Sequence, residues 1–215
     1  MTLPFIVEND LKEVKLASSI YIQQNVFSTK ETQDIREAID KYAYKNQEYS
    51  KINNVKCNYV DFAKLSDYNP TIALGIEKGF IRIQKQLYTQ VYMMMQTVNY
   101  YEMHLRKIDG PTRLHADGMI GFKNDEVVKE DSSVTSEIGV RLFSVIVALN
   151  NDYEGGEFYF PKQDVIVKLK AGEALIFPPY WTHPHSTNEL NGTFRYTINS
   201  WLYECNQDST PACFE

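Results

Sequence analysis

Residues 140–161 read VRLFSVIVALNNDYEGGEFYFP, and this stretch decides the fold class. Its first half is a run of β-branched and aromatic residues, which favour strands. The pair Gly155-Gly156 ends the run, because glycine readily adopts the positive φ angles that turns require. A second short apolar segment follows, with no helical pattern after the glycines. We therefore interpret the pair as a hairpin turn and not as a phosphate-binding loop.

The same pattern extends from this stretch in both directions. Short segments rich in β-branched and aromatic residues begin at Thr97 and continue to residue 204. Turn signals separate them at Asp109-Gly110, Ala171-Gly172 and Asn191-Gly192. Strands at this spacing, without helices between them, predict an antiparallel sandwich or barrel.

The N-terminal part of the chain has a helical pattern instead. A short strand is expected over residues 16–24, followed by a capping-box sequence, STKE, at residues 28–31. Apolar residues then recur at helical spacing, which predicts a helix over residues 30–46 and a long amphipathic helix from 70 to about 95. We expect these two helices to cover one sheet from outside.

The composition excludes several classes of protein. A net charge of −6 and a pI near 5.3 argue against general nucleic-acid binding. No apolar run reaches the length of a membrane span.

Three cysteines without metal-binding spacing, in a chain with no secretory signal, predict reduced thiols and a cytoplasmic protein. The content of 43% hydrophobic and 23% charged residues is that of a globular domain, and we expect a single one.

A polar, acidic insert interrupts the strand pattern at residues 119–139. Connections of this length are usually functional lids or solvated loops. We favour a mobile lid that contacts the substrate, with a solvated loop as the alternative.

The motif RLHADGM contains the first candidate metal ligands. In extended chain, residues i and i+2 point to the same face, so His115 and Asp117 can present an imidazole and a carboxylate together. A distant histidine would complete a 2-His-1-carboxylate site, which leaves positions open on Fe(II). The alternative to a metal site is a surface histidine beside an aspartate in a turn.

The stretch FPPYWTHPHSTN, residues 177–188, offers two histidines for the third position. Pro184 separates them and biases the residue before it toward extended geometry. His183 and His185 are therefore expected to share a face, and orientation alone does not choose between them.

In chain order, the motifs are H-x-D, a strand ending in Leu-Asn, Gly-Gly-Glu-Phe, GEALIFP at residues 172–178, a distal histidine, and Arg195 before an aromatic strand. This series resembles the Fe(II)- and 2-oxoglutarate-dependent oxygenases, specifically the prolyl-4-hydroxylase-like branch. The resemblance covers about Tyr100 to Tyr203, nearly half of the chain.

The resemblance implies a mainly β fold with supporting α-helices. Its core would be a double-stranded β-helix, or jelly roll, flanked by N-terminal helices. Residues 1–96 would then be a helical support region, 97–204 the catalytic core and 205–215 a C-terminal tail.

Several site residues follow from the resemblance. His115 and Asp117 would bind iron, and Arg195 would bind the C5 carboxylate of 2-oxoglutarate. His185 lies ten positions before Arg195 and His183 twelve, and the family's usual spacing favours His185. His183 stays as the alternate ligand or as a substrate-side residue.

Three further residues are weaker candidates. Strand alternation places Thr197 on the same face as Arg195, where its hydroxyl could contact 2-oxoglutarate. Tyr101 is a second candidate for this contact, and Tyr159 is a candidate on the substrate side. Most strand tyrosines are simply core residues with the hydroxyl at an edge.

The implied reaction is hydroxylation of a substrate C–H group, with 2-oxoglutarate decarboxylated to succinate and CO₂. It would use Fe(II) and O₂, and the family admits ascorbate as a further cofactor. The expected substrate is a prolyl or other residue of a peptide or protein. The alternatives are the same chemistry on a nucleobase or free amino acid, or a non-catalytic β-barrel that binds a metal or ligand.

Overall fold

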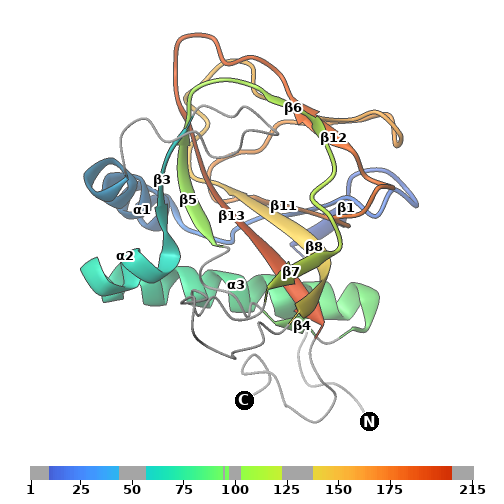
Figure 1. Cartoon of the computed structure of the whole chain (residues 1–215), viewed down its shortest axis with the longest axis horizontal. Coiled ribbons are helices and arrows are strands. Elements are labelled where there is room, and N and C mark those ends of the chain that lie inside the picture. The colour runs from blue at the N-terminus through green and yellow to red at the C-terminus, as the bar shows by residue number, and fades with distance from the viewer. Residues whose placement is uncertain (1–9, 44–56, 94, 97–102, 123–137, 205–215) are drawn as a thin grey trace, which may run out of the picture.

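We describe a computed structural model of the chain, which places residues 10–43, 57–93, 95–96, 103–122 and 138–204. Two antiparallel sheets form the body of the protein, and helices lie against the outer face of the larger sheet (Figure 1). Tyr101 and residues 205–215 lie outside the described residues.

The larger sheet has the strand order β1-β2-β11-β8-β13-β5-β3, with β4 paired to β13 and β7 paired to β8. Its strands are β1 (Leu11–Glu13), β2 (Tyr21–Gln23), β3 (Cys57–Asp61), β4 (Met95–Gln96), β5 (His104–Ile108), β7 (Ile120–Phe122), β8 (Ile138–Ala148), β11 (Ala174–Phe177) and β13 (Arg195–Glu204). The smaller sheet has the order β10-β9-β12-β6. Its strands are β6 (Thr112–His115), β9 (Phe158–Phe160), β10 (Val165–Val167) and β12 (His185–Thr187).

The chain passes repeatedly from one sheet to the other. Strands β5, β8, β11 and β13 belong to the larger sheet, and β6, β9, β10 and β12, which alternate with them along the chain, belong to the smaller one. This winding is the double-stranded β-helix, so the predicted fold class, mainly β with N-terminal helices, is confirmed.

Strand β8 shows why its sequence is apolar without interruption. Val145 and Val147 point to the helices and join the core beneath the larger sheet. Ile146 and Ala148 point the other way and join a second apolar cluster between the sheets. A strand buried on both faces has no polar side, so its sequence loses the usual alternation.

The helices are α1 (Thr29–Tyr42), α2 (Phe62–Tyr68) and α3 (Pro70–Val91). The predicted capping box begins α1: the Ser28 hydroxyl accepts from the Glu31 backbone amide at 3.3 Å, and the Ser28 amide donates to the Glu31 carboxylate at 2.7 Å. Asn69 and Pro70 begin α3. Both predicted helices exist, and each ends four residues before its expected end.

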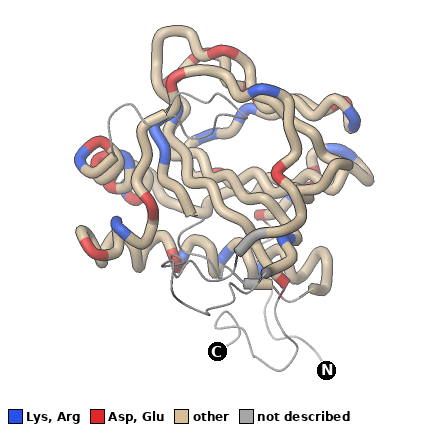
Figure 2. The backbone as a smooth tube through the Cα atoms, viewed as in Figure 1, with Lys and Arg blue, Asp and Glu red and all other residues tan. Residues whose placement is uncertain are grey.

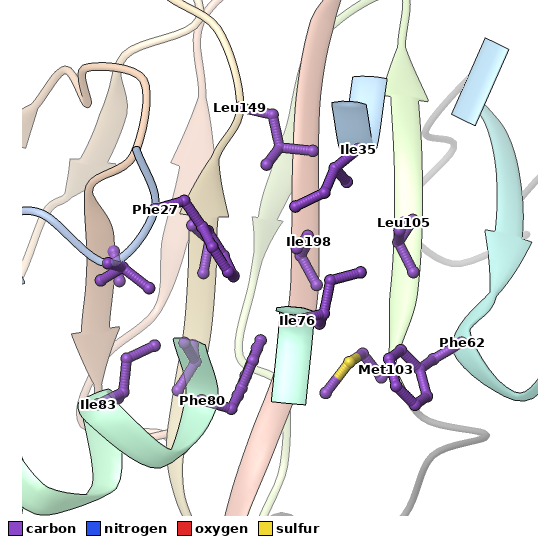
Figure 3. Close-up of a cluster of buried hydrophobic side chains, with 14 of the residues drawn as sticks. Phe27, Ile35, Phe62, Ile76, Phe80, Ile83, Met103, Leu105, Leu149 and Ile198 are labelled. Carbon is purple, nitrogen blue, oxygen red and sulfur yellow. The ribbon is translucent and has the colours of Figure 1, made fainter. Parts of the chain in front are cut away.

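The main apolar core lies between α3 and the larger sheet. Figure 3 shows Ile76, Phe80 and Ile83 of α3 directed at the strands, where they meet Ile198 of β13 and Leu149, among others. These contacts fix the orientation of β8 and β13, so that their opposite faces line the space between the two sheets.

The N-terminal region differs from its expectation in two ways. The short strand expected over residues 16–24 exists, but as the three-residue β2. The region up to residue 96 also contributes strands, since β1, β2 and β3 extend the larger sheet. Helix α2 was also not predicted. Elements of three to seven residues carry too few periodic positions to be distinguished from loop.

The turn at Gly155-Gly156 has the positive φ angles that were predicted, but it does not join two strands of a hairpin. Gly155 and Gly156 have φ angles of 72° and 69°. However, they lie between β8 and β9, which belong to different sheets, so the turn is a crossover and not a hairpin.

Figure 2 shows Lys, Arg, Asp and Glu positions interspersed along the backbone of the described residues in this view. Within the same residues, no helix has both the length and the hydrophobicity that a membrane crossing requires. The prediction of a lid over residues 119–139 remains a prediction, because residues 123–137 are outside the described part.

Candidate metal centre

Two histidines meet where β6 pairs with β12. His115 ends β6 and His185 begins β12, and the register places them directly opposite each other. Their ring centroids are 4.5 Å apart. Asp117 follows in the loop after β6, which is held in place because the Gly118 amide donates to the Pro179 carbonyl at 2.8 Å.

One ligand atom from each of His115, Asp117 and His185 lies within 4.8 Å of the other two. The Oδ1 atom of Asp117 is 3.2 Å from the Nε2 of His115 and 3.8 Å from the Nε2 of His185. Two imidazoles and one carboxylate in this arrangement could hold a divalent metal and leave coordination positions open. The structure therefore brings together the two ligands expected from H-x-D and the favoured distal histidine.

Both histidines are oriented by the same local hydrogen bond. The Nδ1 of His115 donates to the carbonyl of Arg113 at 2.8 Å, and the Nδ1 of His185 donates to the carbonyl of His183 at 3.2 Å. A proton fixed on Nδ1 leaves Nε2 as the ligand atom. Each imidazole is thus prepared for a metal by the backbone carbonyl of the residue two positions before it.

The second carboxylate oxygen of Asp117 is held by the larger sheet. Ser144 of β8 donates to Oδ2 at 2.5 Å, and the indole Nε1 of Trp201 on β13 donates to it at 3.3 Å. Arg141 stacks on the Trp201 ring at 3.9 Å and donates to the Asp117 carbonyl at 3.2 Å. These contacts leave Oδ1 directed at the histidines.

At Asp117 and His185, the electrostatics favour the charge states that a metal needs. Burial alone would raise the pKa of Asp117, but the hydrogen bonds of His115 and Ser144 and the attraction of His185 hold that pKa well below its usual range. Burial lowers the pKa of His185. For His115, burial lowers the pKa, but the contact with Asp117 outweighs this effect, so the pKa is raised. The carboxylate is therefore ionised and His185 neutral near pH 7.

His183 does not join this cluster. Its Nε2 donates to the carbonyl of Ser18 at 2.8 Å, and its Nδ1 accepts from the Thr182 hydroxyl at 2.9 Å. Residue 183 precedes β12, so strand alternation does not place its ring beside that of His185. The expectation that both rings share a face is corrected.

Arg195 lies deep between the sheets at the start of β13. Its side chain is 2% exposed, Nη1 donates to the Gly156 carbonyl at 2.7 Å, and Nη2 lies 3.5 Å from the Thr187 hydroxyl. Among the described residues no carboxylate pairs with it, and its buried Nε has no hydrogen-bond partner there. Burial lowers the pKa of Arg195 to about 10, so it remains a cation at neutral pH.

Thr197 follows Arg195 on the same face of β13, as alternation predicts. It is buried, and its hydroxyl donates to the Asn199 side chain at 2.9 Å. Thr187, which we did not predict, contributes the hydroxyl beside Arg195 and accepts from the Thr112 amide at 2.8 Å. Its signal in the sequence is its position two residues after His185, on the same face of the strand.

Tyr159 is the candidate that the structure places elsewhere. Its neighbours Phe158 and Phe160 are buried in the cluster between the sheets, so Tyr159 points to the outer face of the smaller sheet and is 38% exposed. It does not line the space that contains His185 and Arg195. Tyr101, the other tyrosine proposed, is outside the described residues.

Comparison with known proteins agrees with this site. Residues 93–203 match the family described as the 2OG-Fe(II) oxygenase superfamily. A protein of Acanthamoeba polyphaga mimivirus, whose name assigns it provisionally to the prolyl 4-hydroxylases, is 30% identical over 84 residues. That alignment covers 35% of this chain and 35% of the mimivirus protein, so the chain spans about a third of the length of the curated relative it matches.

Solved structures share the fold at low identity. The viral collagen prolyl hydroxylase of Paramecium bursaria Chlorella virus-1, solved with 2-oxoglutarate, has a TM-score of 0.58 at 16% identity, over 88% of this chain and 98% of that one. The Trichoplax adhaerens prolyl hydroxylase, solved with a hypoxia-inducible-factor peptide, has a TM-score of 0.59 at 14% identity, over 87% and 84%. Because its match covers more than half of the sequence and includes all three clustered ligands, the chain belongs to the 2OG-Fe(II) oxygenase superfamily, with prolyl-4-hydroxylase-like relatives.

Proposed function

We propose that this protein hydroxylates a prolyl, or another, residue of a peptide or protein, using Fe(II), O₂ and 2-oxoglutarate. The observation that carries the proposal is the convergence of His115, Asp117 and His185, together with a buried Arg195 that pairs with no carboxylate among the described residues. A site that only binds a metal has no need of this second feature.

The donor set fits iron. Two neutral imidazoles and a carboxylate on one side are the ligands of non-haem Fe(II) oxygenases. When bound, iron and 2-oxoglutarate would supply the oxidising chemistry, in which 2-oxoglutarate loses CO₂ and becomes succinate. The protein's own contribution is to hold Asp117 ionised through Ser144 and Trp201, and to fix both imidazoles through their backbone hydrogen bonds.

The surroundings of Arg195 fit a carboxylate. A guanidinium presents donors in a planar fork that matches two carboxylate oxygens. One Nη of Arg195 is held by the Gly156 carbonyl, while the buried Nε has no partner among the described residues. Leaving such a donor unsatisfied is costly, so a carboxylate ligand there would stabilise the site. We assign this position to the C5 carboxylate of 2-oxoglutarate, with Thr197 as a further contact.

The substrate class rests on the relatives. The solved neighbours are prolyl hydroxylases, and one of them was solved with a peptide. We infer a peptide or protein substrate here, and no described feature favours a nucleobase or a free amino acid. The presence of Asp117 as a ligand favours hydroxylation, because it occupies the coordination position that a halide would need.

The proposal is tested in two steps. Anaerobic addition of Fe(II) and 2-oxoglutarate to the folded protein should produce the weak visible charge-transfer band of the chelate, and Asp117→Ala should not produce it. Proline-containing peptides incubated with O₂ should then gain the mass of one oxygen atom. Absence of the band in folded wild-type protein would overturn the oxygenase assignment. A band without product on any peptide would overturn only the substrate class.

A further inference from the structure

A second arginine, Arg106, lies beside Arg195 on the interior face of the larger sheet. In the pairing of β5 with β13, Arg106 is opposite Thr197 and Arg195 is opposite Ile108. Arg106 and Arg195 are therefore diagonal neighbours on one face, and such neighbours in antiparallel sheets lie about 7–8 Å apart. Both side chains are long enough to approach a ligand placed between them.

The residues on either side of Arg106 fix the direction of its side chain. Leu105 belongs to the core beneath the sheet, and Lys107 also points to the helices, where it donates to Asp40 of α1 at 2.7 Å. Successive strand residues point to opposite faces, so Arg106 points between the sheets. Its Nε atom is buried there.

The charge of Arg106 acts on Arg195. Burial is the main cause of the lowered pKa of Arg195, and the positive charge of Arg106 lowers it further. Two guanidinium groups on one interior face repel each other, and an anion between them would relieve this repulsion.

Two acidic groups near the site are already engaged. Glu157, whose charge acts on Arg195, pairs with Lys168 at 3.5 Å and accepts from Asn188 at 3.2 Å. Asp117 contacts both metal-site histidines and accepts from Ser144 and Trp201, so its charge would be taken up by the metal.

Resting on the proposed function, we propose that Arg106 is a second cationic contact for the C5 carboxylate of the co-substrate. The carboxylate would lie between Arg106 and Arg195, and the pair would select 2-oxo dicarboxylic acids over monocarboxylic ones. Arg106 is then a specificity-determining residue, in addition to the single basic residue that the sequence motif indicates.

The test is calorimetric titration of the full chain loaded with Mn(II), which replaces Fe(II) without turnover. Two ligands are compared: 2-oxoglutarate, and 2-oxopentanoate, which has the same carbon chain without the distal carboxylate. Arg106→Gln should weaken 2-oxoglutarate binding by about tenfold or more, the effect of losing a hydrogen bond to a charged group. It should leave 2-oxopentanoate binding unchanged. Lys12→Gln, which removes one exposed positive charge on β1, is the control and should alter neither.

Equal weakening of both ligands, or no weakening of either, would overturn the role of Arg106. Failure of the wild type to bind 2-oxoglutarate at all would instead overturn the proposed function. If Arg106→Gln does not fold, the wild type is titrated with the C5 amide of 2-oxoglutarate. Loss of the charge that faces both arginines should then cost about hundredfold or more in affinity, and a smaller loss would contradict the proposal.

Discussion

His183 and His185 allow a matched comparison at the scale of single residues. His185→Ala removes a ligand whose Nε2 lies 3.8 Å from Asp117, and should abolish both metal binding and turnover. His183→Ala removes a contact to the Ser18 carbonyl, and should reduce stability while metal binding persists. Metal content after dialysis and turnover, measured on both variants, check this. Retention of metal by the His185 variant, with loss in the His183 variant, would reverse the assignment.

Arg195→Ala is expected to separate co-substrate binding from metal binding. It removes the guanidinium but none of the three ligands, so 2-oxoglutarate affinity should fall by about 1.5–3 kcal/mol, the range for a hydrogen bond to a charged group. Metal affinity should be largely unchanged. Titration of each ligand separately measures the two effects. Equal loss of both would show that Arg195 supports the metal site and not the co-substrate.

The site residues divide into those that a sequence pattern can reveal and those that it cannot. His115, Asp117 and Arg195 stand in motifs whose spacing has a chemical reason, and the structure brings the first two together. Ser144 and Trp201 contact Asp117 only because the pleat turns them to the interior face opposite the loop after β6. Such contacts depend on strand register and on which sheet each strand joins, which local patterns do not specify.

At the scale of the element, two glycines of α3 should respond oppositely to the same substitution. A Cβ atom on Gly79 would overlap the ring of Phe27, which is buried in the core and cannot move freely, whereas a Cβ on Gly75 meets nothing within 4 Å. Gly79→Ala should therefore destabilise the protein by about 1–3 kcal/mol through overpacking. Gly75→Ala should stabilise it by up to about 1 kcal/mol through helix propensity.

Denaturant unfolding of both variants measures the difference. The two residues belong to one helix, so effects of α3 on the rest of the protein cancel in the comparison. Equal stability of the two variants would show that Phe27 moves aside at little cost, and that the contact between α3 and the segment before α1 is loose.

Elements were predictable in proportion to their length. The 14 residues of α1 and the 22 of α3 have enough turns for a clear apolar face, and β8 has an unbroken apolar run. The strands β1 and β2, with three residues each, are stabilised by pairing with each other and with β11, far away in the sequence. Pairing partners of this kind leave no local periodicity, so β1 was not predicted and the strand expected over residues 16–24 was longer than β2.

At the scale of the whole molecule, ligands should stabilise the folded state. The proposed binding residues for metal and co-substrate come from β6, the loop after it, β12 and β13, in both sheets, so neither ligand would bind the unfolded chain equally well. At about 100 times the dissociation constant, a ligand adds ~2.7 kcal/mol to the free energy of unfolding. For a chain of this size that corresponds to a rise of roughly 5–10 °C in Tm.

Thermal unfolding with Mn(II) alone, and with Mn(II) plus 2-oxoglutarate, should show two successive increases in Tm. In Arg195→Ala the first increase should remain and the second should become much smaller. A single increase from 2-oxoglutarate without metal would contradict chelation as the mode of binding.

The indole that holds Asp117 has a practical consequence, because the chain contains only two tryptophans. Trp181 is 72% exposed, whereas Trp201 lies against Arg141 and donates to Asp117, the proposed ligand. In a Trp181→Phe variant, all tryptophan fluorescence would come from Trp201. Binding of a paramagnetic ion such as Co(II) should quench this emission at once. The protein thus carries its own optical reporter of the metal, and occupancy can be followed in stopped flow without an added dye.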